Sequence, residues 1–329
     1  MAGQVSSGPP VLGIDLGGTK ILAGVIDADH AILGRGKRPT PAREGGEAIL
    51  AAILEAAHEA LEQAGIAAAD LAGVGIGSPG PLDAAAGVIL YSANLNVRNF
   101  PLGPEVAKAL GKPALVGNDV RVGAFGEFRL GAGRGYRDVL AAFVGTGLGG
   151  CLILDGRIVD GYTGNAGEIG HTMIKANGPT CPCGRRGCLE ALTSRTAITR
   201  RIHKAIRKGT PTVLAEHVTS KNSRLKSKEL AAAVAADDPV AVKEVRRAAH
   251  YLGLGLGGLV NLIGPEIVII GGGVVEALGQ PYIDLIRVAA RAQILTDPDE
   301  RIKLEPAALG DDAGILGGAL MARERFAGG

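Results

Sequence analysis

The chain has 329 residues, 47% of them hydrophobic, only 3% aromatic and none of them tryptophan, and its formal net charge is +2. That length is enough for two domains with cores of alanine, leucine, valine and isoleucine, and a charge so near neutral gives no electrostatic reason to expect a nucleic-acid or membrane partner. The first ten residues lack the basic flank and the apolar run of a signal peptide, and no apolar run reaches the roughly 18 residues of a membrane helix.

The first part of the chain alternates predicted strands and helices. It opens with an apolar strand, a glycine turn and a returning strand over residues 11–27, which together predict a β-hairpin. The first predicted helix ends at Gly65, where glycine commonly caps a helix. The elements after the hairpin are, in order, that helix over 47–64, a buried strand over 71–76 leading into the rigid turn 77–81, a short helix over 104–110, a strand over 113–116 before Gly117-Asn118-Asp119, and a helix through Phe128.

The second part repeats the opening design. Residues 139–155 again read as a strand, a Gly/Thr turn, a strand and an aspartate, so the two stretches resemble halves of an internal duplication. Strands that alternate with helices throughout indicate the α/β class. The remaining predicted elements are helices over 189–208, 239–263, 283–292 and 313–325, the last one capped by Asp312, and strands over 266–270 and 302–304, the first of which leads through Gly271-Gly272-Gly273 into a helix start.

One predicted helix is strongly basic. A nucleic-acid patch is one interpretation, but no aromatic residues interleave the cations, so a solvated helix face is favoured. The cations within 189–208 are Arg195, Arg200, Arg201, Lys204, Arg207 and Lys208.

A cysteine-rich loop is the most specific feature. Three of the four cysteines lie within eight positions, and a histidine lies ten residues before the first of them. Thiolates and an imidazole are ligands that a closed structural zinc site prefers, and Gly184 and Gly187 give the backbone the freedom to wrap a small ion. Buried cysteines, or a disulfide with one free thiol, are the alternatives. Clustered thiols without an export signal also indicate a reducing cytoplasm. The predicted ligands are His171, Cys181, Cys183 and Cys188.

Several glycine turns are candidates for binding phosphate. Two stretches that begin at Gly75 and Gly145 match G-x-G-x-x-G, but neither opens a helix, as a dinucleotide site requires. The Gly/Thr turns at 15–20 and 145–150 instead present bare backbone amides that suit an anion, with Asp15 placed to hold a hydrated magnesium. Gly271-Gly272-Gly273 is a third such place. Each alone reads as an ordinary turn; together with the zinc loop they favour nucleotide binding.

Four motifs together resemble the sugar kinases of the ROK family (repressor, open reading frame, kinase). They are Asp15-Leu-Gly-Gly-Thr-Lys20, Gly117-Asn118-Asp119, Glu168-Ile-Gly-His171 and Cys181-x-Cys183-Gly-x-x-Gly-Cys188-x-Glu190. The resemblance covers essentially the whole chain. It implies the actin-like, ribonuclease-H-like ATPase fold, in which two α/β domains close on a cleft for ATP and a hexose. We expect a small domain over 1–121 plus 311–329 and a large domain over 122–310 that carries the zinc loop.

The resemblance also implies a role for each motif. Asp119 resembles the family's catalytic base, which takes the proton of the sugar 6-hydroxyl as it attacks the γ-phosphate of ATP. His171 would bind zinc through one ring nitrogen and a sugar hydroxyl through the other. The implied sugar ligands are Gly80, Asn99, Asn118, Asp119, Glu168, His171 and Glu190. The implied nucleotide and Mg²⁺ ligands are Asp15, Gly17, Gly18, Thr19, Lys20, Gly145, Thr146, Gly147, Gly272 and Gly273.

The substrate and the assembly stay open within this resemblance. The stretch 190–198 looks closest to bacterial glucokinases, which favours glucose, whereas N-acetylmannosamine, N-acetylglucosamine, allose or fructose are substrates of other members. Polyphosphate is the alternative donor to ATP. A regulator is the non-enzyme alternative, but only fourteen residues precede Asp15, too few for a helix-turn-helix. We expect a cytoplasmic homodimer or homotetramer with small-molecule partners and neither a nucleic-acid nor a membrane partner.

Overall fold

The computed structural model describes residues 8–220, 223–297 and 299–327. The chain divides into two compact units, called unit 1 (Met1–Arg134 and Asp311–Gly329) and unit 2 (Gly135–Gly310). The first boundary therefore lies after Arg134, not after residue 121. The reason is that helix α3 (Asp119–Leu130) packs along its length on α10 (Ala313–Phe326) within unit 1. A Cβ on Gly317 of α10 would lie 1.8 Å from the carbonyl oxygen of Val122, so this contact depends on glycine.

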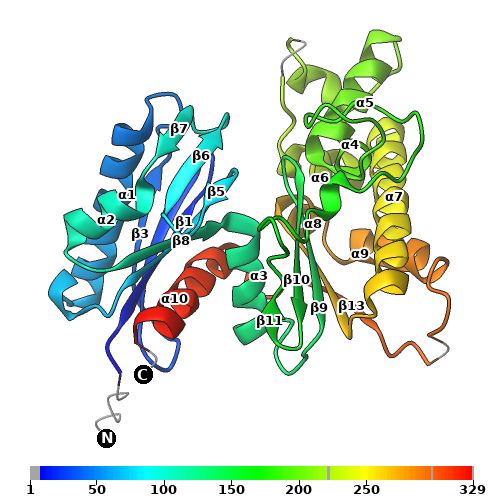
Figure 1. Ribbon diagram of the computed structural model, residues 1–329. Coiled ribbons are helices and arrows are strands. Elements are labelled where there is room, and N and C mark those ends of the chain that lie inside the picture. Colours follow the sequence, from blue (N-terminus) through cyan, green and yellow to red (C-terminus); the bar gives the residue numbers. More distant parts are fainter. Residues whose placement is uncertain (1–7, 221–222, 298, 328–329) are drawn as a thin grey trace, which may run out of the picture. The chain divides into compact units, whose positions relative to one another are not determined.

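Unit 1 is built on a five-stranded mixed sheet of order β3-β2-β1-β4-β8 (Figure 1). The β1–β2 and β2–β3 pairs are antiparallel, while β1–β4 and β4–β8 are parallel. Helices α1 and α2 pack against one face of the sheet, and α10, with α3 beside it, packs against the other. Its other elements are β1 (Val11–Leu16), β2 (Lys20–Ile26), β3 (Ile32–Pro39), α1 (Gly46–Ala64), β4 (Val74–Ser78), β5 (Leu82–Asp83), β6 (Val88–Ser92), β7 (Val97–Phe100), α2 (Leu102–Leu110) and β8 (Ala114–Asn118).

Alternation along β1 explains how its residues are divided between the two faces. Leu12, Ile14 and Leu16 are fully buried in the core formed with α1 and α2. Gly13 and Asp15 point the other way, because successive strand residues face opposite sides of a sheet. A Cβ on Gly13 would lie 1.8 Å from the carbonyl oxygen of Ile315 in α10. Asp15 is thereby placed against α10, and not in the main core.

Unit 2 repeats this design with the order β11-β10-β9-β12-β13. Here too the first two pairs are antiparallel and the last two are parallel. The matching topology confirms the predicted internal duplication and the actin-like ATPase fold. The elements are β9 (Val139–Val144), β10 (Leu148–Leu154), β11 (Arg157–Ile158), α4 (Glu190–Thr193), α5 (Arg195–Arg207), α6 (Ser227–Ala235), α7 (Pro239–Ile263), β12 (Ile267–Gly271), α8 (Gly273–Leu278), α9 (Gln280–Arg291) and β13 (Lys303–Pro306).

The long helix α7 begins at the predicted residue and packs closely against α9. The Asp238 carboxylate accepts hydrogen bonds from the backbone amides of Val240 (3.0 Å) and Ala241 (2.9 Å), which satisfies the first turn. Its glycines allow α9 to approach, since a Cβ on Gly253 would lie 2.6 Å from the Ile286 carbonyl oxygen.

Several elements differ from the sequence prediction. Strand β3, the small sheet β5-β6-β7 and helix α6 were not predicted. The expected helix over 189–208 is broken at Ser194, whose hydroxyl oxygen accepts from the amide of Ala197 (3.2 Å) and starts α5. Asp312 makes no side-chain cap for α10; its carboxylate instead binds Arg35 (2.9 Å to Nη2).

Among the residues that the structure describes, every helix is too short or too polar to span a bilayer.

Candidate functional site

The parallel strands of unit 1 bring several predicted site residues to one edge of the sheet. Asp15 of β1 lies opposite Gly77 of β4, and Ser78 at the end of β4 lies opposite Asn118 at the end of β8. Asp119 follows directly as the first residue of α3. The carboxyl edge of parallel strands is where α/β proteins commonly bind ligands.

The side chains of Asn118 and Asp119 both accept hydrogen bonds at the start of α3. The Asn118 side-chain oxygen accepts from the amides of Val120 (3.1 Å) and Arg121 (3.2 Å) and so forms the helix cap. Asp119 Oδ1 also accepts from Val120 (2.9 Å). The Asp119 carboxylate therefore lies at the helix N-terminus, where the positive end of the helix dipole stabilises negative charge.

Asp15 is the most perturbed carboxyl of this edge. Burial, the largest cause, and the Asp119 and Asp311 carboxylates together raise its pKa from 3.8 to about 6, against the opposing effect of Lys20. Asp15 lies against α10 so closely that a Cβ on Gly314 would be 2.7 Å from its carboxyl carbon. The positive charge of Lys20 is not available to Asp15 alone, because the Lys20 Nζ also lies 2.5 Å from Asp311 Oδ2. A buried carboxylate beside a second carboxylate is a group that a divalent cation would stabilise.

The turn that joins β1 to β2 has the form expected of an anion cradle. The Gly17 amide donates to the Lys20 carbonyl oxygen (3.0 Å), and the Thr40 hydroxyl donates to the Gly17 carbonyl oxygen (2.7 Å). Gly18 and Thr19 at the tip are exposed, and no atom would contact a Cβ on Gly18. The tip is therefore held from β3 while its amides stay accessible.

Gly80 lies two residues after the end of β4, and Asn99 belongs to the small sheet β5-β6-β7. Gly80 has φ +110°, and a Cβ there would lie 2.5 Å from the Tyr91 carbonyl oxygen, so the position requires glycine for packing. Asn99 is exposed on β7 of the small sheet, with φ +49°. Ser78 is a residue that the sequence analysis missed: its hydroxyl is fully buried and has no hydrogen-bond partner within the described part of the chain.

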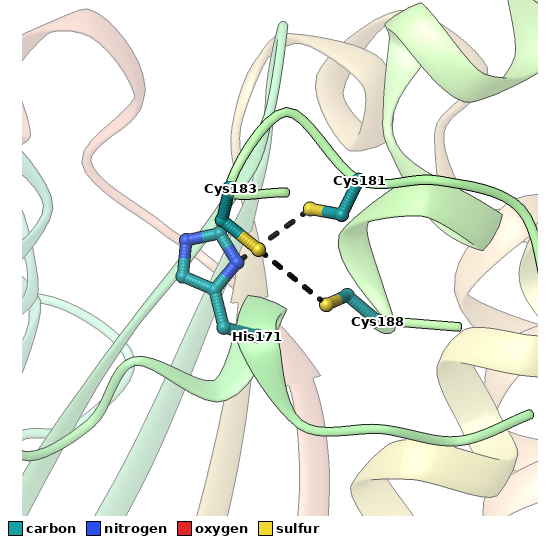
Figure 2. Close-up of side chains that lie close together, drawn as sticks. All are labelled: His171, Cys181, Cys183 and Cys188. Carbon is teal, nitrogen blue, oxygen red and sulfur yellow. Dashed lines mark hydrogen bonds between the residues drawn. The ribbon is translucent and has the colours of Figure 1, made fainter. Parts of the chain in front are cut away.

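The cysteine-rich loop of unit 2 gathers its four predicted ligands (Figure 2). The ligand atoms of His171, Cys181, Cys183 and Cys188 all lie within 4.8 Å of one another. His171 Nδ1 lies 3.7 Å from Cys181 Sγ, and the sulfurs of Cys183 and Cys188 are also 3.7 Å apart. Tetrahedral zinc with Zn–S bonds of about 2.3 Å would separate two sulfurs by about 3.8 Å. The donor set and its spacing fit zinc.

The thiols of this cluster are free, so the alternative of a disulfide is not what the structure contains. Burial raises the pKa of the Cys181 thiol to about 12. Such a thiol stays protonated at neutral pH unless a bound cation displaces the proton. The buried Cys181 thiol is therefore arranged to bind a metal.

Two glycines shape the loop as predicted. Gly184 has φ +88° and Gly187 has φ +76°, conformations that favour glycine. A Cβ on Gly187 would lie 1.8 Å from the Lys175 carbonyl oxygen. Below the loop, Leu189 is fully buried in the core of unit 2, which fixes the residue that follows it, Glu190.

Glu190 connects the metal cluster to the Gly/Thr turn between β9 and β10. Its Oε2 accepts from the Leu148 amide (3.0 Å), and its Oε1 lies 3.6 Å from Cys181 Sγ. A Cβ on Gly147 would lie 2.5 Å from Glu190 Oε2, so a larger residue there would displace this carboxylate. The carboxylate assigned to the sugar thus also holds the turn at Gly145–Gly147.

The start of α5 holds the same turn from the other side. Arg195 Nη2 donates to the Thr146 hydroxyl (2.8 Å), and the Thr196 hydroxyl donates to the Thr146 carbonyl oxygen (2.7 Å). Burial and the nearby Arg224 lower the pKa of the Arg195 guanidinium. The sequence analysis placed Arg195 on a solvated face, because nothing local distinguishes it from the other cations of the helix.

The third predicted glycine stretch lies beside this turn. Strands β9 and β12 are parallel neighbours, with Phe143 opposite Gly271. Gly272 has φ +89°, and a Cβ there would lie 2.8 Å from the Val144 amide nitrogen. Gly273 then begins α8. Unit 2 therefore brings Gly145–Gly147 and Gly272–Gly273 together.

The last predicted ligand, Glu168, is exposed at the start of the short 3₁₀ turn η2 (Ile169–His171). Its carbonyl oxygen accepts from the His171 amide (3.0 Å), so both residues share one turn. In unit 1, Asp15, Asn118 and Asp119 share one sheet edge. In unit 2 lie Glu168, His171, Glu190 and the glycine turns at 145–147 and 272–273.

The comparisons with known proteins agree on one family. The model of the family described as the ROK family matches residues 11–325. A glucokinase of Halalkalibacterium halodurans is 34% identical over 315 residues, 95% of each chain. The crystal structure of a ROK family glucokinase from Streptomyces griseus in complex with glucose and AMPPNP has a TM-score of 0.81 and 35% identity over 96% of this chain and 99% of its own. An N-acetylmannosamine kinase of Citrobacter koseri is 30% identical over 95% of this chain and 98% of its own length.

Proposed function

The chain belongs to the ROK family, and on that premise we propose that it transfers the γ-phosphate of ATP to the 6-hydroxyl of a hexose, with glucose as the preferred substrate. The observation that carries the proposal is the connection within unit 2 from the metal cluster through Glu190 to the turn at Gly145–Gly147. A group suited to sugar hydroxyls and a turn suited to phosphate are thereby held by the same side chain.

Unit 1 supplies the general base in this proposal. Asp119 accepts the proton of the sugar 6-hydroxyl, which makes the oxygen a better nucleophile as it attacks the γ-phosphate. Its place at the N-terminus of α3 orients it, and the helix dipole there favours negative charge. Asn118, whose side-chain oxygen caps the helix, offers its amide nitrogen to a sugar hydroxyl.

Mg²⁺ and the phosphates are assigned to the turns. Asp15 fits a hydrated Mg²⁺, because its burial beside a second carboxylate disfavours its charge and a cation would relieve that cost. The amides of Gly18 and Thr19, with Lys20, are assigned to phosphate oxygens, whereas the Gly17 amide is engaged by the Lys20 carbonyl oxygen and only shapes the turn. When bound, Mg²⁺ would neutralise charge that develops on the phosphates.

In unit 2 the metal loop orients the sugar ligands. His171 directs Nδ1 toward the cluster, which leaves Nε2 for a sugar hydroxyl. Glu168 and Glu190 are assigned to neighbouring hydroxyls, because carboxylates accept paired hydrogen bonds. The amides of Gly145–Gly147 and Gly272–Gly273, with the Thr146 hydroxyl, are assigned to the nucleotide, and Arg195 adds positive charge beside Thr146.

The test is a panel of hexoses assayed with ATP and Mg²⁺, followed as the 6-phosphate products. We expect the highest kcat/KM for glucose. Highest activity on N-acetylmannosamine would instead support the alternative suggested by the Citrobacter koseri relative. A parallel series with inorganic polyphosphate decides the donor. Sugar binding without turnover, with either donor and every hexose, would favour a regulator.

We also propose that the chain forms a homodimer or homotetramer through α7 and α9. Val288 is 72% exposed and Leu285 38% exposed, and both line an apolar depression of about 370 Å³ with Leu254. Isolated exposed apolar residues are common, but contiguous ones mark interfaces. Val288→Glu is expected to lower the mass measured by light scattering, while Arg157→Glu at an exposed position of β11 leaves it unchanged. Equal masses for both variants and the parent would contradict this interface.

A further inference from the structure

A pocket of about 870 Å³ in unit 2 is lined mainly by cations. Nine lysine or arginine side chains and one carboxylate, Glu244, line it. They come from separate segments, among them Lys175 of the loop after His171, Arg186 of the cysteine loop, Lys204 of α5 and Lys243 of α7. The pocket shares no residue with the glycine turns or the metal ligands.

The charge of this pocket is not balanced by the protein. Glu244 pairs with Arg201 (2.5 Å), and the side chains of both are largely buried. Over the described ranges, none of the other eight lining cations has a carboxylate within ion-pair distance. The whole chain has a net charge of only +2, so this is a local concentration. Like charges held together raise the free energy of the fold, and a bound anion would remove that cost.

Part of the pocket is held in place before any ligand binds. Arg200 donates to the carbonyl oxygens of Thr180 (3.2 Å) and Ala191 (3.0 Å), and Arg186 Nε donates to the Gly178 carbonyl oxygen (3.1 Å). Guanidinium groups fixed in this way are suited to planar, multidentate contacts with phosphate oxygens. Lys204 and Lys243 are exposed and, over the residues described, make no hydrogen bond or ion pair.

We propose that this pocket binds a small molecule that carries several clustered phosphates. The number of unpaired cations exceeds what one phosphate could engage, which favours an oligophosphate. No aromatic residue lines the pocket, so it lacks the stacking surfaces that single-stranded nucleic acid uses. The inference goes beyond the proposed kinase reaction and does not depend on it.

Occupancy of the pocket would act on the metal loop. Arg186 lies between the ligands Cys183 and Cys188, and Lys175 follows His171 on the same loop. An anion that contacts these two side chains together with Lys204 or Lys243 ties the loop to α5 and α7. The pocket is therefore placed to regulate the order of the loop that carries His171 and Glu190.

The experiment is calorimetric titration of the full-length, zinc-loaded chain with tripolyphosphate, without sugar. The test variant is Lys204→Glu/Lys243→Glu, and the control is Arg157→Glu/Lys228→Glu, which changes the net charge equally at exposed positions of the same unit that lie outside the pocket. We expect the test variant to lose at least about tenfold in affinity, since charge-assisted hydrogen bonds are among the strongest in proteins. The control should bind as the parent does, and circular dichroism should show both variants folded.

Three further titrations identify the ligand and can overturn the proposal. ATP as tight as tripolyphosphate indicates a nucleoside polyphosphate, weaker ATP binding indicates an inorganic one, and orthophosphate should bind least. Any binding of tripolyphosphate at the glycine turns persists in the test variant, so the difference between variants is the readout. Equal affinity for parent and test variant, no binding by the parent, or tighter binding of a single-stranded RNA than of tripolyphosphate would each refute the pocket as an oligophosphate site.

Discussion

Asp15→Asn is expected to stabilise the protein at neutral pH while it abolishes catalysis. The carboxyl has a pKa of about 6 in the folded chain, because burial and the neighbouring carboxylates Asp119 and Asp311 disfavour its charged form. In the unfolded chain the same group has the ordinary value of 3.8. The folded state therefore holds the proton more tightly, and the stability that comes from the protonated form is lost as the pH rises through 6.

The magnitude follows from that shift. A difference of about two pKa units corresponds to about 3 kcal/mol, at 1.36 kcal/mol per unit. The penalty is absent below about pH 4, where Asp15 is protonated in both states, and it is complete above about pH 6. Asparagine resembles the protonated carboxyl in size and polarity. Asp15→Asn should thus gain up to about 3 kcal/mol at pH 7.5 and almost nothing at pH 4.

Urea unfolding followed by circular dichroism measures this difference, since the chain has no tryptophan for a fluorescence signal. The control is Asp29→Asn, an exposed carboxyl of the same unit, which should change stability by less than about 0.5 kcal/mol. Excess Mg²⁺ should stabilise the parent at pH 7.5 but not Asp15→Asn. A variant that is no more stable than the parent at pH 7.5, or that gains as much at pH 4, would refute the reasoning.

Substitutions at three other residues separate the roles assigned above. Asp119→Asn should lower kcat by about 100- to 10,000-fold with little change in the sugar KM, because a positioned base is lost while the fold is kept; turnover near the parental rate would exclude Asp119 as the base. Cys183→Ser should lower the zinc content measured by mass spectrometry and raise the KM of both the sugar and ATP, and full zinc content with unchanged KM values would contradict the metal site. Glu190→Gln can still accept from the Leu148 amide, so it should raise mainly the sugar KM. Glu190→Ala should raise the KM of ATP as well. If the two variants changed the KM of ATP equally, Glu190 would not hold the turn.

Features set by short stretches of sequence could be predicted. The hairpins follow from apolar strands around glycine turns, and the start of α7 follows from Asp238 before Pro239. The four metal ligands follow from their spacing, because three of them lie within one loop whose glycines have left-handed φ values. The duplication was visible as a repeated strand, turn and strand, and the two sheets with the same strand order confirm it.

Features that depend on tertiary contacts could not be predicted. Strand β3 carries Gly34 and Gly36, which read as loop residues, yet they are needed because a Cβ on either would lie within about 2.1 Å of a backbone oxygen of α1. The cations of α5 looked alike in sequence. In the structure, Arg195 donates a hydrogen bond to Thr146, whereas Lys204 lines a pocket together with cations of α7. Only the packing of distant segments makes that distinction.

The position of Glu190 explains how a structural metal can matter for a reaction at a distance from it. Cys188 is a predicted metal ligand, Leu189 beside it is fully buried, and Glu190 begins the next helix. The chain from the metal to the carboxylate therefore has no flexible step. Since Glu190 also accepts from the Leu148 amide, disorder of the loop would reach the turn at Gly145–Gly147. A metal in this cluster would then fix sugar ligands and nucleotide turn together, so that its loss should weaken the binding of both substrates and not of the sugar alone.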